Sequence, residues 1–177
     1  MLPSPALAPP AYFRLVLGPQ DDYFSDEGKR TLLESVYSVS PASDRMGMRL
    51  AGPTLEHAKG YNIVSDGIAP GSIQVPGNGL PIVLLADRQT TGGYPKIATV
   101  ISADMPALGR LTPGAKVAFK AIGIAEAEAT HRQLCADIDA IAESIVGVRA
   151  SIDETRLLES NLVSGMIDAH DWRPDGA

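Results

Sequence analysis

Between Tyr37 and Phe119 the chain alternates short apolar runs with clusters of Gly, Pro, Asn and Asp, and this pattern constrains the fold more than any other feature. The runs are short enough for β-strands and too short for most helices. Many short strands separated by turn residues are typical of a sandwich or barrel, and not of alternating strands and helices. We therefore predict strands in the segments YSVS, GMRLAG, YNIVS, GSIQVP, PIVLLAD, KIATVIS and KVAFKAI.

One of these runs, PIVLLA at 81–86, is apolar at successive positions. Such a strand needs cover on both faces, so we expect it in the middle of a sheet or lining a closed barrel. Upstream, YFRLVLG at 12–18 predicts another strand, which a Gly-Pro pair ends. Ser25 can then cap a short helix whose first turn holds Asp26 and Glu27, where the helix dipole favours anions.

After residue 124 the pattern becomes that of a helix. Four apolar residues recur at spacings of four, three and four, which makes one stripe of an amphipathic helix: Leu134, Ile138, Ile141 and Ile145. Gly147 can end this helix. Because the stripe is narrow, we expect the helix on the outside of the β body. Periodicity leaves open whether 157–168 is a second helix or a returning strand.

These patterns divide the chain into four parts. Residues 1–11 form a proline-rich leader or linker, because four prolines disfavour helix. The β domain follows over 12–123. Residues 124–169 form a C-terminal helical extension packing on the barrel, and 170–177 form a loose tail.

Composition and charge argue against several classes of function. The net charge of −6 and the lack of a basic run make nucleic acid or an anionic membrane an unexpected partner. The proline-interrupted N-terminus has no early positive charge and predicts neither a signal peptide nor a membrane span. A single cysteine, Cys135, rules out an internal disulfide, so a cytoplasmic location is expected. The three histidines lie far apart and predict no metal site.

Two polar segments admit either a structural or a functional interpretation. In SDRMGMR, Asp44 and Arg45 either form a surface pair of little energetic value or present, with Arg49, a guanidinium fork for a carboxylate or phosphate. On a strand, Arg45 and Arg49 would point the same way. In SIQV, Gln74 alternates with apolar neighbours and lies either on an exposed edge or in a cleft.

The densest polar segment, DRQTTGGYPKIA, directly follows the apolar run. Its two glycines allow positive φ or a close approach of the backbone to a ligand, and Tyr94 and Lys96 can project the same way. A plain hairpin needs only one or two turn residues, so we interpret this segment as the rim of a site; the alternative is a solubilising hairpin. The site residues predicted here are Asp87, Arg88, Gln89, Thr90, Thr91, Gly92, Gly93, Tyr94 and Lys96.

Three stretches together resemble the biotin-dependent carboxyltransferase family: DDYF, VSPASDRMGMRL and SDGIAPGSIQVPGNGLPIVLLADRQTTGGYPKIATVISADMPALGRLTPG. That family includes the carboxyltransferase part of urea amidolyase, allophanate hydrolase subunit 2, the C subunit of 5-oxoprolinase and the Kip antagonist. The resemblance runs from about Arg14 to Phe119. It implies a mainly β, cyclophilin-like β-barrel, here with a short N-terminal helix and a C-terminal amphipathic helix. Family members carry another domain before the equivalent of YFRLVLGPQDD, so this chain resembles their C-terminal half.

The resemblance also implies a function. It points to ATP-dependent opening of 5-oxoproline to glutamate in a multi-subunit complex, with ATP bound by the complex. One alternative is carboxyl transfer from carboxybiotin to urea, with biotin supplied by another domain or chain. The other is a non-catalytic regulatory role in binding a Kip inhibitor-like protein.

The partners that the resemblance implies are the N-terminal domain of the same protein, a Kip inhibitor-like protein (the B subunit of 5-oxoprolinase) and a lactam-utilisation protein (the A subunit of that enzyme). In the family, the functional cleft forms between domains and with the Kip inhibitor-like partner. We therefore expect the isolated domain to be inactive.

For either reaction at an amide, cationic and amide donors would stabilise the charge that develops on the carbonyl oxygen. The resemblance then implies catalytic roles for Lys96 as a cation and for Tyr94 and Asp87 in proton handling. The residues expected to bind substrate are Arg88, Gln89, Thr90, Thr91, Gly92, Gly93, Gln74, Arg45 and Asp44.

Overall fold

The computed structural model describes residues 9–144. The chain divides into one unit, Met1–Glu143, and a second, Ser144–Ala177, of which only Ser144 is described. Most of residues 1–11, and all of 157–168 and 170–177, for which we made predictions, lie outside the described residues.

The main sheet has eight strands in the order β10-β1-β8-β5-β6-β3-β2-β9. Their bounds, in chain order, are β1 Phe13–Leu17, β2 Tyr37–Val39, β3 Gly47–Ala51, β5 Ser72–Gln74, β6 Ile82–Leu84, β8 Lys96–Val100, β9 Lys116–Val117 and β10 Phe119–Ala121. A separate two-stranded sheet pairs β4 Asp66–Gly67 with β7 Thr91–Gly92. The fold is mainly β, as predicted.

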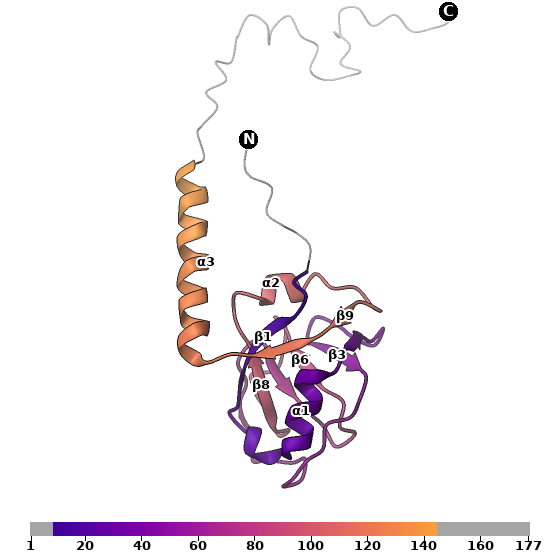
Figure 1. The fold of residues 1–177 in the computed structure, drawn as a ribbon. Helices are drawn as coiled ribbons and strands as arrows, with labels where there is room; N and C mark the ends of the chain where they lie inside the picture. Colours follow the sequence, from indigo (N-terminus) through magenta and orange to yellow (C-terminus); the bar gives the residue numbers. More distant parts are fainter. Residues whose placement is uncertain (1–8, 145–177) are drawn as a thin grey trace, which may run out of the picture. The chain divides into compact units, whose positions relative to one another are not determined.

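One continuous segment holds both ends of the main sheet. β9 pairs antiparallel with β2, while β10, two residues further along, pairs parallel with β1. Between them the carbonyl of Ala118 accepts a hydrogen bond from the Phe13 amide at 2.8 Å. The sheet therefore curls until its first and last strands are supplied by consecutive residues, which makes a nearly closed, barrel-like sheet (Figure 1).

The core fills the inside of this barrel. Most strands contribute apolar side chains that are almost fully buried, and the largest buried apolar side chains are those of Tyr37, Phe13, Leu15, Leu32, Leu50, Ile73 and Ile97. Strand β6 lies between β5 and β3, in the middle of the sheet, which confirms the position predicted from the apolar run PIVLLA.

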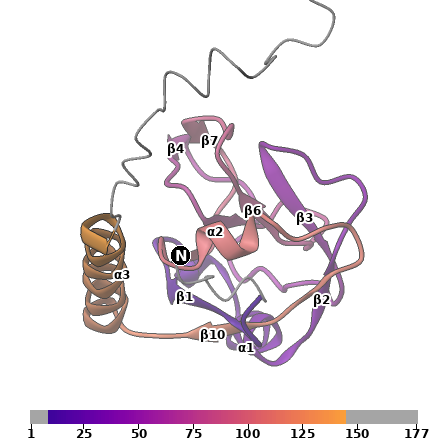
Figure 2. The same cartoon turned by 90° about the horizontal axis from the view of Figure 1, so that it is seen from above.

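Two short helices complete the barrel. Helix α1, Asp26–Glu34, begins as predicted at Ser25, whose hydroxyl accepts a hydrogen bond from the Gly28 amide at 3.0 Å. Gly28 is needed there, because a Cβ would lie 2.6 Å from the Glu56 carbonyl oxygen. Helix α2, Met105–Leu108, which the sequence pattern did not predict, lies over one end of the barrel (Figures 1 and 2). A 3₁₀ turn, η1, spans Asp21–Tyr23.

The strand predicted in YNIVS is wrong. Residues 61–65 form a loop in which Tyr61 is 50% exposed and Val64 is 91% exposed. A strand needs one face to bury its alternating apolar residues, and this segment has none. Its Ile63 amide donates to the Gly93 carbonyl at 2.8 Å, so the loop runs beside the Gly-Gly turn.

Helix α3, Ile124–Ser144, confirms the helix predicted after residue 124. Ser102 at the end of the barrel and His131 on the helix are joined by a hydrogen bond of 3.1 Å. Ile138, one member of the predicted apolar stripe, is 55% exposed. That residues 124–169 pack on the barrel along their length stays a prediction. No helix within residues 9–144 is both long and apolar enough to cross a membrane.

Candidate functional site

The face of the sheet that points away from the core carries a cavity of about 330 Å³. It lies over β3, β5 and β6 and is bounded by the loops on either side of them. The lining residues are Asp44, Met46, Gly47, Arg49, Gln74, Pro76, Asn78, Ile82, Leu84, Gln89 and Tyr94. Polar side chains from three separate segments thus meet over three adjacent strands.

Strand register explains why these side chains converge. Arg49 on β3 and Gln74 on β5 are both paired with Ile82 on β6, so the three lie in one row across the sheet. Because side chains alternate along a strand, the next row, Met48, Val83 and Ile73, points to the opposite face and is buried in the core. The apolar run PIVLLA therefore has one face in the core and the other in the cavity floor.

Gln74 lines the cavity, as the cleft interpretation predicted, and it is not on an edge. Its side chain is buried, because β5 is an inner strand. Its amide Nε2 donates to the Tyr94 carbonyl at 3.4 Å. The amide oxygen is then the group left for a ligand, and it can accept a hydrogen bond from an N–H.

Arg49 is the cation of this cavity. No ion pair or hydrogen bond of its guanidinium is present among residues 9–144, although its backbone is fixed by Ser40 and Ser43. Every other arginine considered for the site is engaged, as shown below. An unpaired guanidinium beside a cavity is a binding group for a carboxylate or phosphate.

Two further polar groups have fixed orientations. Asn78 Oδ1 accepts from the Leu80 amide at 3.1 Å, which leaves its NH₂ group as a donor. Asp44 Oδ1 accepts from the amides of Met46 and Gly47 at 2.8 and 3.0 Å, and so holds the turn before β3. Asp44 therefore has a structural role in addition to lining the cavity.

The polar turn after β6 contributes only part of its length to this cavity. Gln89 and Tyr94 line it, while Thr91 and Gly92 form β7 against β4. Thr90 supplies its carbonyl to the Ile68 amide at 3.0 Å. A Cβ on Gly92 would lie 2.7 Å from Gln74 Nε2, so this glycine lets β7 approach the cavity floor. Neither Gly92 nor Gly93 has positive φ.

Lys96, which we expected to be catalytic, is placed elsewhere. Its side chain is 2% exposed and its Nζ contacts Asp66 Oδ2 at 2.8 Å. Gln20 Nε2 donates to the same carboxylate oxygen at 3.0 Å. Hydrogen bonds from Lys96, from the Gly67 amide and from Gln20 hold the pKa of Asp66 below its ordinary value. Lys96 is not among the residues that line the 330 Å³ cavity.

Arg45, Asp87 and Arg88 lie on the far side of the turn. Arg45 forms a two-point ion pair with Asp87, with Nε–Oδ2 at 2.8 Å and a second contact at 3.2 Å. The guanidinium fork that we considered is thus directed at a protein carboxylate, and Arg45 does not share a face with Arg49. Arg88 donates to the carbonyls of Ile68 and Leu85. Arg45 and Arg88 line a different cavity, of about 430 Å³, with apolar neighbours.

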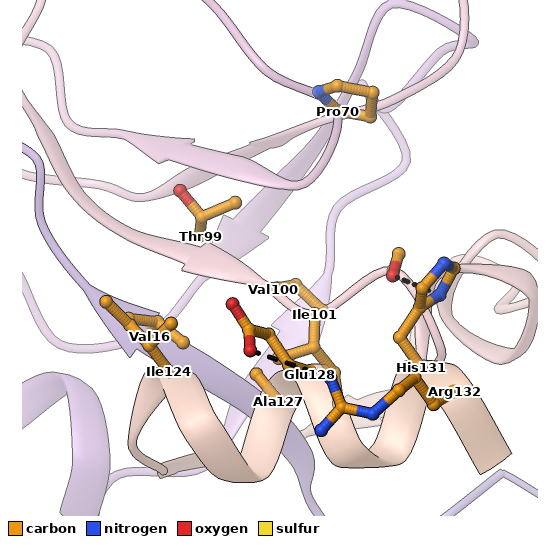
Figure 3. Close-up of a pocket in the computed structure, with 11 residues that line it drawn as sticks. Val16, Pro70, Thr99, Val100, Ile101, Ile124, Ala127, Glu128, His131 and Arg132 are labelled. Carbon is orange, nitrogen blue, oxygen red and sulfur yellow. Dashed lines mark hydrogen bonds and ion pairs between the residues drawn. The ribbon is translucent and has the colours of Figure 1, made fainter. Parts of the chain in front are cut away.

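The largest of these cavities, about 510 Å³, lies between the barrel and α3 (Figure 3). Its walls are mostly apolar, with Val16, Ile101 and Ile124 among the lining residues. The polar groups on the helix side contact other protein groups: Glu128 pairs with Arg132 at 3.7 Å and His131 with Ser102. The smaller, polar cavity is the better candidate for a site that recognises a metabolite.

Asn78 was not considered from the sequence, and Arg49 was considered only as the partner of Arg45 in a guanidinium fork and was left out of the expected site residues. The signal for Arg49 was its alternation with Gly47 on β3, which puts both on the face opposite the buried Met48. Asn78 lies in the segment PGNG, and asparagine is common in turns, so nothing in the sequence indicated a role in a site.

Comparisons with known proteins agree with this fold. A family model described as "Carboxyltransferase domain, subdomain A and B" matches residues 2–121. The C subunit of 5-oxoprolinase from Haemophilus influenzae is 46% identical over 97 residues, which are 55% of this chain and 31% of that protein. The C subunit of 5-oxoprolinase from Escherichia coli is 40% identical over 114 residues, which are 64% of this chain and 37% of that protein.

Among solved structures, the urea carboxylase of Kluyveromyces lactis is similar with a TM-score of 0.69 and 25% identity. The match covers 73% of this chain and 12% of that protein. The chain therefore corresponds to about a third of the length of the two curated relatives and to a smaller part of the urea carboxylase. The family match contains every strand of the barrel and every residue of the 330 Å³ cavity. The chain belongs to the family of carboxyltransferase domains, subdomains A and B.

Proposed function

We propose that this chain supplies the substrate-binding wall of a protein similar to the C subunit of 5-oxoprolinase. In the assembled complex, 5-oxoproline would occupy the 330 Å³ cavity during its ATP-dependent opening to glutamate. The two curated relatives, with 46% and 40% identity, are both named as C subunits of 5-oxoprolinase, which supports this reaction over others of the family.

The observation that carries the proposal is the match between the cavity and a small amide. Its volume of about 330 Å³ is at the lower end of the range for ligand sites, which suits a metabolite and not a larger ligand. The Gln74 amide oxygen can accept the lactam N–H, and Gln89 and Tyr94 can donate to the lactam oxygen. Ile82 and Leu84 form an apolar surface for the ring carbons.

ATP does not fit this cavity. A nucleoside triphosphate needs several cations or backbone amides around its phosphates, and Arg49 is the single cationic residue in the lining. We therefore assign ATP binding to another part of the complex. The role of this chain is to bind and orient the lactam, and Tyr94 is the group in the lining best suited to proton handling at the lactam.

Other protein must complete the site. Arg49, Gln89 and Tyr94 are all exposed, so the cavity opens towards solvent on the side opposite the sheet. Catalysis at an amide benefits from exclusion of water, which this wall alone does not provide. The N-terminal domain of the same protein, a Kip inhibitor-like subunit and a lactam-utilisation subunit are the partners we propose for the facing wall.

Carboxyl transfer to urea is the second candidate function, and the structural similarity to the Kluyveromyces lactis urea carboxylase favours it. Urea and the ureido ring of biotin both present N–H and C=O groups that Gln74 and Gln89 could bind. Urea carries no carboxylate that would use the unpaired Arg49 guanidinium, whereas carboxybiotin carries one on its ureido nitrogen. The cavity therefore fits 5-oxoproline better than it fits urea.

The test is ATP hydrolysis by the full-length protein reconstituted with its partner subunits, measured with and without 5-oxoproline. Stimulation by 5-oxoproline is expected. The Gln74→Met variant keeps the packing of the cavity floor and should raise KM for 5-oxoproline by up to about 10-fold, which corresponds to one lost hydrogen bond. Gln133→Met, on the exposed surface of α3, is the matched control and should change nothing.

Three results would contradict the proposal. If the assembled complex shows no stimulation by 5-oxoproline, the reaction is wrong, and urea with a carboxylated biotin donor becomes the next substrate to try. If partners bind and neither reaction is seen, a regulatory binding role replaces both. If KM for 5-oxoproline is unchanged in Gln74→Met, the reaction stands but the cavity is not its site.

A further inference from the structure

A second, smaller cavity adjoins the candidate site. It has a volume of about 130 Å³ and is lined by Ser40, Arg49, Leu50, Ala51, Asn78, Leu80, Pro81 and Ile82. Three of these residues, Arg49, Asn78 and Ile82, also line the 330 Å³ cavity. The two cavities therefore adjoin at these three residues, and we call them the large lobe and the small lobe. The small lobe is too small for a second metabolite and suits a substituent of the ligand in the large lobe.

The polar groups where the two lobes adjoin are donors. Arg49 presents a guanidinium with no ion pair or hydrogen bond among residues 9–144, and Asn78 presents its NH₂ group because its oxygen is held by the Leu80 amide. No acidic residue lines the small lobe. A lobe with one unpaired cation, one amide donor and no carboxylate is complementary to an anion.

The register of the strands places this anion next to an amide. Gln74 and Arg49 lie in one row on either side of Ile82, so their backbones are about 10 Å apart across two strand spacings. The side chain of Arg49 lines the same cavity as Ile82 and Gln74, and it is long enough to span part of that distance. In an α-carboxylated lactam, the carboxylate and the N–H stand on neighbouring atoms. One ligand can therefore donate its N–H to Gln74 and place its carboxylate on Arg49.

We propose that Arg49, with Asn78, is the specificity-determining residue of the site, and that it selects amides carrying an adjacent carboxylate. This rests on the proposed function, which it deepens by naming the residues that separate 5-oxoproline from urea or a neutral lactam. Because Arg binds a carboxylate at two points and Lys at one, Arg49→Lys should retain only part of the selectivity of wild type.

The test compares 5-oxoproline with its neutral analogue, 5-oxoprolinamide. Equilibrium binding and steady-state turnover are measured for the full-length protein in its complex. Wild type should bind 5-oxoproline about 10- to 100-fold more tightly than 5-oxoprolinamide, since hydrogen bonds to charged groups contribute more than neutral ones. Arg49→Gln should lose this preference by weakening only the acid. Arg110→Gln, an exposed arginine outside both lobes, is the matched control and should behave as wild type.

The outcomes separate this inference from the proposed function. If wild type binds the acid selectively and Arg49→Gln abolishes that selectivity, the inference is supported, even if no turnover follows. A lack of turnover would then refute only the proposed reaction. Equal binding of the acid and the neutral amide by wild type overturns the inference even where turnover is normal. An Arg49→Gln protein that keeps the preference, or that loses both ligands equally, also overturns it. Failure of wild type to bind either ligand overturns both proposals.

Discussion

The ion pair between Lys96 and Asp66 should respond very differently to the loss of each partner. The Lys96 side chain is 2% exposed, whereas that of Asp66 is 53% exposed. In Lys96→Met the charge left behind is a carboxylate that water can solvate, and the new side chain is apolar and of similar length. In Asp66→Asn the charge left behind is a buried ammonium. We therefore expect Asp66→Asn to be the more destabilising of the two substitutions.

The size of the difference follows from burial. A buried charge that loses its partner costs about 3–5 kcal/mol, whereas a half-exposed carboxylate that loses its partner remains solvated and costs little. A loss of 1 kcal/mol lowers Tm by about 2–4 °C in a domain of this size. The ammonium stranded by Asp66→Asn should thus lower Tm by about 6–20 °C, and Lys96→Met should lower it by no more than a few degrees.

Urea denaturation and thermal melting followed by circular dichroism measure both variants, and pH supplies a second check. Because the folded-state pKa of Asp66 is lowered, its contribution to stability is present above the ordinary value of 3.8 and is lost as pH falls through the folded-state pKa. Wild type should therefore lose stability relative to Lys96→Met below about pH 4. If Lys96→Met is the more destabilising variant at pH 7, our account of the pair is refuted.

The remaining predictions concern the core and its closure. Tyr37 is fully buried, its hydroxyl has no hydrogen-bond partner among residues 9–144, and burial raises its pKa to about 12. Tyr37→Phe should raise the free energy of unfolding by about 1 kcal/mol in urea denaturation, and a loss of 1 kcal/mol or more would refute this. Phe119→Ala, in the segment that holds both ends of the sheet, should lower it by about 3–5 kcal/mol. Lys120→Ala, on the exposed neighbour, should cost little, and equal effects would show that closure does not depend on the Phe119 side chain.

Much of the fold could be predicted because local pattern and tertiary structure agree in the barrel. The strands at GSIQVP, PIVLLAD and KIATVIS lie where turn residues placed them, and Ser25 caps α1 as its residue type favours. α2 and the pair β4–β7 could not be predicted, since they are only two to four residues long. Elements of that length depend on contacts that no window of sequence contains.

The site was predicted only in part, because local pattern fixes the direction of some of its side chains and not of others. Gln74, Gln89 and Tyr94 were expected and do line the cavity, because strand alternation fixes the face of Gln74 and the turn brings the other two beside it. Lys96 was expected to project the same way as Tyr94, but β8 begins only at Lys96, and Tyr94 lies in the bend before it. The alternation of side chains along a strand therefore does not relate the two residues.

The segment Lys116–Ala121 also sets the order in which this protein can be completed during synthesis. Its β10 pairs with β1, which leaves the ribosome about a hundred residues earlier. Until residue 121 has emerged, both β1 and β2 lack the neighbours that cover them and present open strand edges. A nascent chain that stalls before that residue would expose two edges at once, and these are the surfaces most prone to intermolecular pairing. Once residues 116–121 have emerged, they cover both strand edges, and the newly made domain becomes less prone to aggregation.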